Sequence, residues 1–214
     1  FAHGWWLSGS SKMSKSIGNV VNPLDLIEQY GVDPVRFYLM REMVLGQDAN
    51  FTMDSFVKRY NSDLANDFGN LLNRITTLLN KNFEGIIPEE GERTSDEESI
   101  IGSVEALVNN MDIKIKEMKI NESIEEIMQF VRSINKYMEY QKPWVLVKED
   151  KNNAARVLYT AGESIRIAAV LLSPVMPNRC ADVLHVFDSG KSTKWGQLKS
   201  GSKLNDHKAL FPRI

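Results

Sequence analysis

Apolar residues recur at spacings of three and four over most of this chain, which is the pattern of helices with one buried face. The most extended row follows Asp54, a residue type that often begins helices. Its members are Phe56, Tyr60, Leu64, Phe68, Leu71, Leu72, Ile75, Leu78 and Leu79. The pattern therefore predicts one long amphipathic helix that begins at Asp54 and ends near Asn82.

Two further long helices are predicted after a loop that contains Pro88. Ser95 with Glu98 has the spacing of a capping box, which begins a helix whose apolar positions extend over 101–118. Ser123 with Glu126 has the same spacing and indicates the start of the next helix.

The remaining chain predicts two more helices and an irregular tail. Pro143 ends the preceding helix, because proline lacks the backbone N–H that a helix interior needs. Apolar rows predict helices over 158–172 and about 176–188. Residues 189–214 are rich in Gly, Ser and Lys and end in the apolar stretch "ALFPRI". The predicted fold class is mainly α, a helical bundle preceded by a short mixed segment.

The mixed segment contains two shorter helical pieces in "NPLDLIEQYGVDPVRFYLMREM". Asp33 followed by Pro34 predicts an N-cap and the first turn of the second piece. The stretch "GQDANFTMD" interrupts the pattern before the long helix begins.

Composition narrows the class of protein without assigning a function. The chain has 214 residues, a formal net charge of −2 and 43% apolar residues, as expected for a globular protein of one or two domains. No apolar run is long enough to predict a membrane span. Cys180 is the one cysteine, which excludes a disulfide within the chain and predicts an inert core residue. With three scattered histidines, the chain has no dense Cys/His zinc pattern. Because it begins with Phe1 in mid-domain sequence, we expect a fragment of a longer protein.

The segment 9–19 carries Lys12 and Lys15, several serines and no acid. Ammonium groups and hydroxyls among flexible residues suit a phosphate group. The loop lacks the G-x-x-x-x-G-K-[ST] pattern of a Walker A loop. On charge alone, a solvated surface loop is the alternative interpretation.

The stretch "KMSKS" at 12–16, followed by "IGNVVNPLDLIEQYGVDPVRFYL", resembles the signature of class I aminoacyl-tRNA synthetases. The resemblance implies that the ATP-binding residues are Lys12, Met13, Ser14, Lys15 and Ser16. Lys12 and Lys15 are the implied catalytic residues, with Lys15 stabilising the pyrophosphate leaving group. Such a role agrees with the rule that a positioned cation lowers the barrier where negative charge develops. ATP with Mg²⁺ is the implied substrate, and no metal ligands are expected in this chain.

Four other stretches resemble the methionyl-tRNA synthetase family in its bacterial or organellar form: "FAHGWW", "NSDLANDFGNLLNRITTLLNKNF", "INKYMEYQKPWVLVKED" and "LFPRI". The family couples methionine to ATP and transfers it to tRNA(Met), whose CAU anticodon it recognises. A cytoplasmic enzyme is implied, with a mitochondrial or plastid one left open. One alternative is a class I synthetase for isoleucine, leucine, valine or cysteine. Another is an RNA-binding module without activity in isolation, and a third is a helical scaffold.

The resemblance also implies a domain division. Residues 1–53 correspond to the end of the catalytic domain, with the KMSKS loop and a segment that contacts the tRNA stem. Residues 54–188 correspond to the helical anticodon-binding domain, and residues 189–214 to a tail that packs back on the bundle. The HIGH-type motif and the methionine pocket are absent, so the chain alone is expected not to aminoacylate.

The resemblance places anticodon binding on Asn70, Arg74 and Trp144. Asn70 and Arg74 are four residues apart and so share a helix face, beside the apolar row. Trp144 follows Pro143 at a helix break, where a ring can be presented to solvent. Stacking on rings and hydrogen bonds to base edges are how proteins bind unpaired RNA bases. Without the resemblance, solvated surface or core would be the simpler interpretation, and whether Asn66 contacts RNA stays open.

Overall fold

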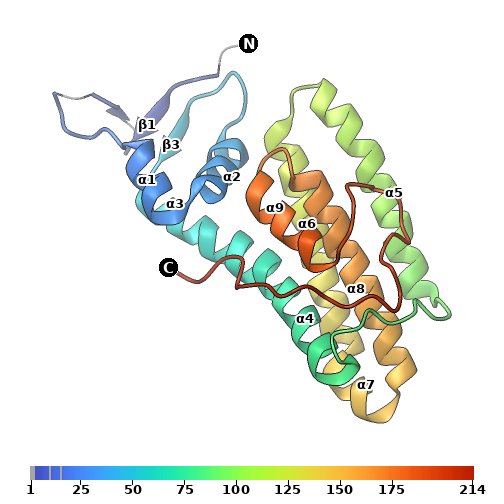
Figure 1. Ribbon diagram of the computed structural model, residues 1–214. Coiled ribbons are helices and arrows are strands. Elements are labelled where there is room, and N and C mark those ends of the chain that lie inside the picture. The colour runs from blue at the N-terminus through green and yellow to red at the C-terminus, as the bar shows by residue number, and fades with distance from the viewer. Residues whose placement is uncertain (1–2, 10, 15) are drawn as a thin grey trace.

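A computed structural model describes residues 3–9, 11–14 and 16–214 of the protein. Helices dominate these residues, and a small sheet lies at the N-terminal end (Figure 1). In the sheet, β1 (Trp6–Ser8) lies between the other two strands. It pairs antiparallel with β2 (Ser11–Lys12) and parallel with β3 (Ala49–Phe51). The prediction of a mainly helical protein after a short mixed segment is confirmed.

The helices α1 (Pro23–Tyr30) and α2 (Val32–Glu42) follow the loop and pack on each other. The prediction that Asp33 caps its own helix is wrong. Gly31, with a φ of 85°, precedes the first turn of α2 and supplies no side chain to it. The Asp33 carboxylate instead accepts a hydrogen bond of 2.6 Å from the backbone N–H of Arg179, in a distant helix.

The long helix predicted from Asp54 is continuous but changes its winding. It consists of α3 (Met53–Arg59), the π-helix η1 (Tyr60–Gly69) and α4 (Asn70–Phe83). Thr52 caps its first turn, with its side chain accepting a hydrogen bond from the Ser55 backbone N–H. The expected bounds are therefore confirmed, while the wider winding in the middle was not predicted.

The spacing of the buried side chains explains the π-helix. Phe56, Tyr60, Leu64, Phe68 and Leu72 are all buried and follow one another at steps of four. At 3.6 residues per turn, each such step drifts by about 40° around an α-helix. A π-helix has more residues per turn because its hydrogen bonds reach five residues back, so the wider winding keeps this row against the core. The Asn70 N–H, bonded to the Ala65 carbonyl, is such a bond.

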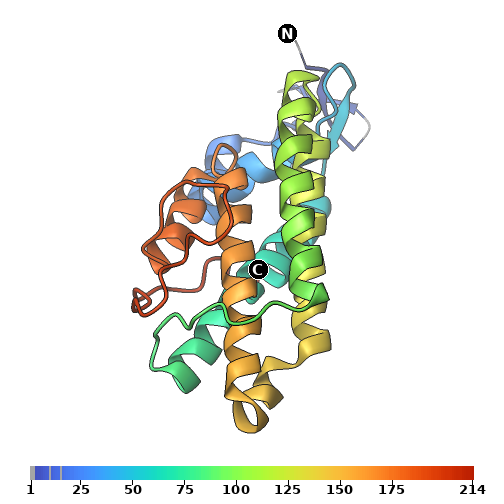
Figure 2. The same ribbon diagram turned by 90° about the vertical axis from the view of Figure 1, so that its right-hand side faces the viewer.

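The bundle is built from α5 (Ser95–Lys116), α6 (Ile120–Gln141), α8 (Lys151–Leu172) and α9 (Pro177–Val186), with the long helix 53–83 laid against them (Figures 1 and 2). The helix α8 is central, and its residues from Val157 to Ala169 are all buried. Short α7 (Pro143–Glu149) links α6 to α8 and was not predicted as a helix.

The capping box of α5 is one residue earlier than predicted, at Thr94 and Glu97. Glu97 is 1% exposed and also accepts a hydrogen bond from the Tyr137 hydroxyl of α6. Burial raises the pKa of Glu97, but the hydrogen bonds from Thr94 and Tyr137 outweigh it and hold the pKa below its usual value. The next helix, α6, begins at Ile120 rather than at Ser123, whose hydroxyl bonds back to the Lys119 carbonyl.

The tail after Ser189 runs across the bundle without forming a helix (Figure 1). It is held by an isolated β-bridge between Lys203 and Ile86, and by the buried side chains Leu198, Leu204, Leu210 and Phe211. At its end, the Ile214 carbonyl accepts a hydrogen bond of 2.8 Å from Asn61 of η1. The tail thus returns to the helix that carries Asn70.

Candidate functional site

The loop after β1 is closed by the side chain of Asn19. Its Oδ1 accepts a hydrogen bond of 2.8 Å from the Ser14 N–H, and its Nδ2 donates to the Lys12 carbonyl at 3.3 Å. Met13 is half-buried and packs against the core, while Ser16 is exposed. Lys15 lies outside the described residues. The described part of the loop therefore presents Lys12 and Ser16 outward and anchors itself through Met13.

Lys12 lies over the ring of Trp5, with its Nζ 3.9 Å from the ring centroid. The strand register accounts for this contact, because Lys12 pairs with Leu7 and so shares a sheet face with Leu7 and the residues two positions away. Trp5 is itself fixed by a hydrogen bond of 2.7 Å from its backbone N–H to Asp48. A cation over an aromatic ring is a favourable contact even at an exposed site.

The predicted anticodon residues lie where α4 meets α7. Asn70 is the first residue of α4 and is exposed, and Arg74 follows one turn later. The Arg74 guanidinium carbon is 5.1 Å from the centroid of the Trp144 ring. Arg74 and Trp144 are thus in contact, with Asn70 on the same helix face. Anticodon binding by these three residues is a prediction, and we refer to them as the anticodon face.

The break before α7 positions Trp144. The Lys142 backbone has a φ of 49°, in the left-handed region, which turns the chain sharply after α6. Pro143 is buried and occupies the first position of α7, where its missing N–H costs nothing. Trp144 comes next and remains 37% exposed. A stacking platform needs such an accessible ring.

Glu139 of α6 is a neighbour of the anticodon face that the sequence reasoning missed. Its Oε1 is 3.0 Å from Nη2 of Arg74, and the Glu139 side chain is largely exposed. Arg74 is therefore held by a carboxylate and by a ring in the same structure. No sequence signal marks Glu139, since the contact joins two helices that are far apart in the sequence.

Asn66, whose role was left open, binds the tail. Its Oδ1 accepts hydrogen bonds of 3.1 and 2.6 Å from Nε and Nη2 of Arg213. A groove of about 340 Å³ lies between this part of the long helix and the tail, and Asn70, Asn73 and His207 also line it. The His207 side chain is placed by a contact of 2.9 Å between its Nε2 and Thr76 Oγ1. The groove has no acidic residue in its lining, so it suits a neutral or anionic group.

The remaining expectations concern metals, thiols and membranes. In the described part of the chain, no three His, Cys, Asp or Glu side chains gather where they could hold a metal ion. Cys180 is fully buried, and burial raises the pKa of its thiol. Across the same residues, none of the helices combines the length and apolar character needed to cross a membrane.

Comparison with known proteins connects both parts of the chain to one family. Residues 1–76 match the family model of class I tRNA synthetases (M), and residues 87–210 match the anticodon binding domain of methionyl tRNA ligase. The methionine–tRNA ligase of Bacillus subtilis (strain 168) is 40% identical over 225 residues, covering 100% of this chain and 34% of that protein. That of Caldanaerobacter subterraneus subsp. tengcongensis is 37% identical over 222 residues, covering 100% of this chain and 35% of that protein.

The fold is similar to that of solved structures from the same family. Mycobacterium tuberculosis methionyl-tRNA synthetase in complex with methionyl-adenylate gives a TM-score of 0.93 at 33% identity, covering 100% of this chain and 44% of that one. The chain spans about a third of the length of the curated relatives that it matches.

These findings confirm the resemblance seen in the sequence and favour the methionyl family over the synthetases for isoleucine, leucine, valine or cysteine. More than half of the chain, residues 87–210, matches a domain specific to methionyl-tRNA ligase. The chain belongs to the methionyl-tRNA ligase family.

Proposed function

We propose that this chain is the part of a methionine–tRNA ligase that carries the ATP-facing loop and recognises the CAU anticodon of tRNA(Met). The observation that carries the proposal is the contact between Arg74 and Trp144. These two side chains come from different helices, and the anticodon assignment needs them side by side on an accessible surface. The family membership and the loop at 12–16 support the same conclusion.

The proposal divides the chain into three working parts. Residues 1–53 end the catalytic domain and carry the loop and the segment that contacts the tRNA stem. Residues 54–188 form the anticodon-binding bundle, and residues 189–214 form the tail packed on it. A cytoplasmic enzyme is the corresponding expectation for its location.

In the complete ligase, the loop would act on ATP bound with Mg²⁺. Methionine attacks the α-phosphate, methionyl-adenylate forms and pyrophosphate leaves. The ammonium groups of Lys12 and Lys15, with Met13, Ser14 and Ser16 around them, would lie against the triphosphate. Negative charge grows on the leaving group in this step, and a positioned cation stabilises it most at that moment. The methionyl group is then transferred to the terminal ribose of the tRNA.

The anticodon face would bind unpaired bases by three different contacts. The Trp144 ring offers a surface for stacking, and the amide of Asn70 offers a donor and an acceptor to a base edge. Arg74 lies against Trp144 and Glu139 in this structure. A base that stacks on Trp144 therefore either takes the opposite ring face or displaces the guanidinium, which is then free to bind the RNA.

The test is a titration of the chain with a stem-loop carrying the CAU anticodon, beside one that differs at a single anticodon base. Tryptophan fluorescence reports binding, and Trp144→Phe shows how much of the signal comes from this ring. We expect a preference of roughly tenfold or more for CAU, equal to about 1.4 kcal/mol. Equal affinity for both stem-loops would contradict the proposal.

A matched control separates the anticodon face from any exposed aromatic residue. Tyr140 lies four residues before Trp144 and is 78% exposed, more than Trp144 itself. Tyr140→Ala should leave the CAU preference unchanged, whereas Arg74→Ala should lower both affinity and preference.

The alternative of an RNA-binding module without activity in isolation concerns these 214 residues alone. We expect no methionine-dependent pyrophosphate exchange from them, because the sequence contains no HIGH-type motif and the family resemblance implies that the methionine pocket lies outside these residues. In the complete ligase, Lys15→Ala should slow exchange and leave stem-loop binding unchanged. Equal damage to both functions would contradict this division of roles.

A further inference from the structure

The helix α2 joins the loop-bearing segment, residues 3–53, to the bundle through polar contacts at both of its ends. One end meets the turn between α8 and α9, and the other meets α6 and the long helix (Figure 1). Each end uses specific charged side chains rather than apolar packing alone.

At the first end, Asp33 caps a helix of the bundle. The helix α9 begins at Pro177, and its own N-cap residue, Met176, supplies no side-chain hydrogen bond. The Asp33 carboxylate accepts hydrogen bonds from the Arg179 N–H at 2.6 Å and from the Asn178 side chain at 3.2 Å. Arg179 is the third residue of α9, the position whose N–H an N-cap side chain normally satisfies. Asp33 is 2% exposed, so this cap is enclosed.

Arg36, one turn later, binds the other side of the same turn. Its Nε donates to the Val175 carbonyl at 2.9 Å, and its Nη2 donates to the Pro174 carbonyl at 2.8 Å. These carbonyls lie in the turn that follows the end of α8. Asp33 and Arg36 together therefore hold both sides of the turn between α8 and α9.

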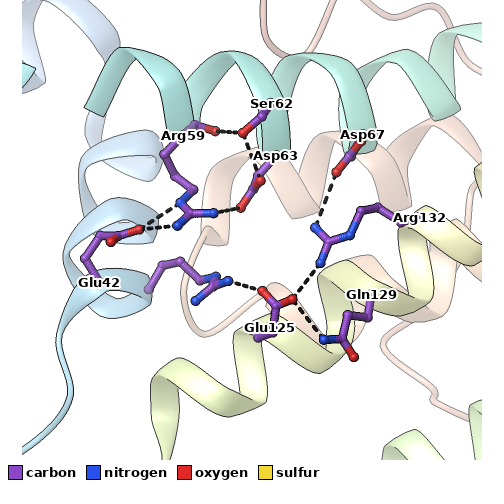
Figure 3. A network of polar contacts seen from close by, with 9 residues as sticks. Glu42, Arg59, Ser62, Asp63, Asp67, Glu125, Gln129 and Arg132 are labelled. Atoms are coloured by element: carbon purple, nitrogen blue, oxygen red, sulfur yellow. Dashed lines mark hydrogen bonds and ion pairs between the residues drawn. The ribbon is translucent and has the colours of Figure 1, made fainter. Parts of the chain in front are cut away.

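At the second end, Arg41 and Glu42 bind two different elements of the bundle, and Figure 3 shows Glu42 beside Arg59. Arg41 forms an ion pair with Glu125 of α6 and is 15% exposed. Glu42 accepts a hydrogen bond of 2.7 Å from Nε of Arg59, and Arg59 also pairs with Asp63 at 3.2 Å. These groups are partly withdrawn from water, where charged contacts are screened less than on an open surface.

From the second end, further polar contacts extend toward the anticodon face. Glu125 also pairs with Arg132 at 2.7 Å, and Arg132 reaches Asp67 of η1 at 3.4 Å (Figure 3). Asn135, one turn further along α6, donates to the Asp67 backbone carbonyl at 3.0 Å. Asp67 lies three residues before Asn70, in the last turn of the π-helix. A chain of direct contacts thus runs from Arg41 to the last turn of η1, three residues before Asn70.

We infer that α2 is a brace that fixes the loop-bearing segment relative to the anticodon face, with Asp33, Arg36 and Arg41 as its positioning residues. In this role, none of the three residues contacts ATP or an RNA base. They act by setting how the loop-bearing segment, which ends the catalytic domain in the proposed function, lies relative to the RNA that the bundle has bound. The effect on bound RNA is the functional part of the inference and rests on the proposed function. The fixed position of the loop-bearing segment is the mechanical part and rests on the contacts alone.

The mechanical part is tested on this chain by a distance between spin labels. Leu24→Cys on α1 and Ile113→Cys on α5 are suitable positions, because the native side chains are 70% and 54% exposed. Cys180 is 0% exposed and will not take a label in the folded chain. We expect a narrow distance distribution in the parent and a broader or shifted one after Glu125→Gln, which keeps the side-chain size and removes the charge.

Two controls make the result specific. Glu122→Gln removes an ion pair with Lys114 that joins α5 and α6 within the bundle, and should leave the distribution as in the parent. A second label pair inside the bundle, Ile113→Cys with Tyr140→Cys, should not change in any variant. Asp33→Ala perturbs the opposite end of α2 and should also broaden the first distribution. An unchanged distribution after both Glu125→Gln and Asp33→Ala would overturn the inference.

The functional part is tested in the complete ligase by separating two steps. Pyrophosphate exchange needs no tRNA, so the exchange rate of Glu125→Gln should stay within about twofold of the parent rate. The rate of transfer to tRNA should fall by about 10- to 100-fold, which is the cost of misplacing reacting groups by about 1 Å. The Kd for the CAU stem-loop should stay unchanged. If exchange and transfer fall together, or if neither falls, the coupling between loop and anticodon face is wrong.

The outcomes also separate this inference from the proposed function. A parent chain that shows no CAU preference would contradict the proposed function, while the spin-label distances would still decide whether α2 is a brace. A parent that prefers CAU but keeps the same distances in every variant would contradict only the brace.

Discussion

The tail is held to the bundle by an ion pair that is fully enclosed, and its removal has a predictable cost. Glu163 and Arg166 of α8 are both 0% exposed and lie 2.7 Å apart. Glu163 also accepts hydrogen bonds from the Gln197 and Leu198 N–H groups at 2.9 and 3.1 Å. Arg166 donates in turn to the backbone carbonyl of Lys194 at 2.9 Å. The pair therefore satisfies backbone groups of the tail as well as itself.

The variant Glu163→Ala leaves the Arg166 guanidinium buried without its counter-ion. Breaking a buried pair in this way typically costs about 3–5 kcal/mol. For a chain of this size, 1 kcal/mol corresponds to about 2–4 °C, so the melting temperature should fall by roughly 6–20 °C. Urea unfolding followed by circular dichroism measures the loss of free energy. Limited proteolysis between residues 189 and 199 should accelerate at the same time, because the detached tail becomes accessible.

The double variant Glu163→Met with Arg166→Leu tests the reasoning more sharply. Replacing both members of a buried ion pair by apolar residues is often neutral or stabilising. Here the tail would still lose its backbone partners, at about 0.5–1.5 kcal/mol each. We therefore expect the double variant to remain about 2 kcal/mol or more below the parent. A double variant as stable as the parent would show that apolar contacts alone hold the tail.

Four further outcomes follow from the geometry. Trp144→Ala should weaken binding of the CAU stem-loop by about 1–3 kcal/mol, the usual value of base–aromatic stacking. Unchanged affinity in the fluorescence titration would mean that the ring has a structural role. Glu139→Gln should release Arg74 from an exposed ion pair worth about 0–1 kcal/mol. Binding of the CAU stem-loop should therefore strengthen by up to about fivefold, and weaker binding in the same titration would contradict this. Burial raises the pKa of the Cys180 thiol. The thiol should therefore react with a colorimetric thiol reagent only after urea unfolds the chain, and rapid reaction of the native protein would contradict this expectation. The pKa of Glu97 is lowered in the folded chain despite burial. Its carboxylate therefore stabilises the fold at pH values above the pKa of the unfolded chain, about 4.3, and this effect is lost as the pH falls through the lower pKa of the folded chain. The difference in unfolding free energy between parent and Glu97→Gln should shrink below that pH, and a constant difference would argue against it.

Local sequence was sufficient to predict most helices, because helix formation depends on apolar spacing within a few turns. The rows that begin at Phe56 and end at Leu172 correspond to observed helices, with shifts of a few residues at most ends and an earlier start of α8, at Lys151 rather than at 158. One of these rows also contained a signal for the π-helix, the steps of four from Phe56 to Leu72. A search for spacings of three and four reads those steps as an ordinary α-helix. Whether Trp144, Arg74 and Asn70 bind an anticodon remains a prediction.

Other features depended on contacts between segments far apart in the chain. Asp33 has the local pattern of a cap for its own helix, yet its carboxylate binds the Arg179 N–H of α9. Glu139 has no local signal, because it meets Arg74 across two helices that are far apart in the sequence. A polar side chain is satisfied by whichever partner lies nearest in space, and periodicity along one helix carries no information about that partner. The sequence by itself therefore determined most of the helices, the loop and the family. Only the tertiary structure decided which charged groups join the loop-bearing segment, the bundle and the tail.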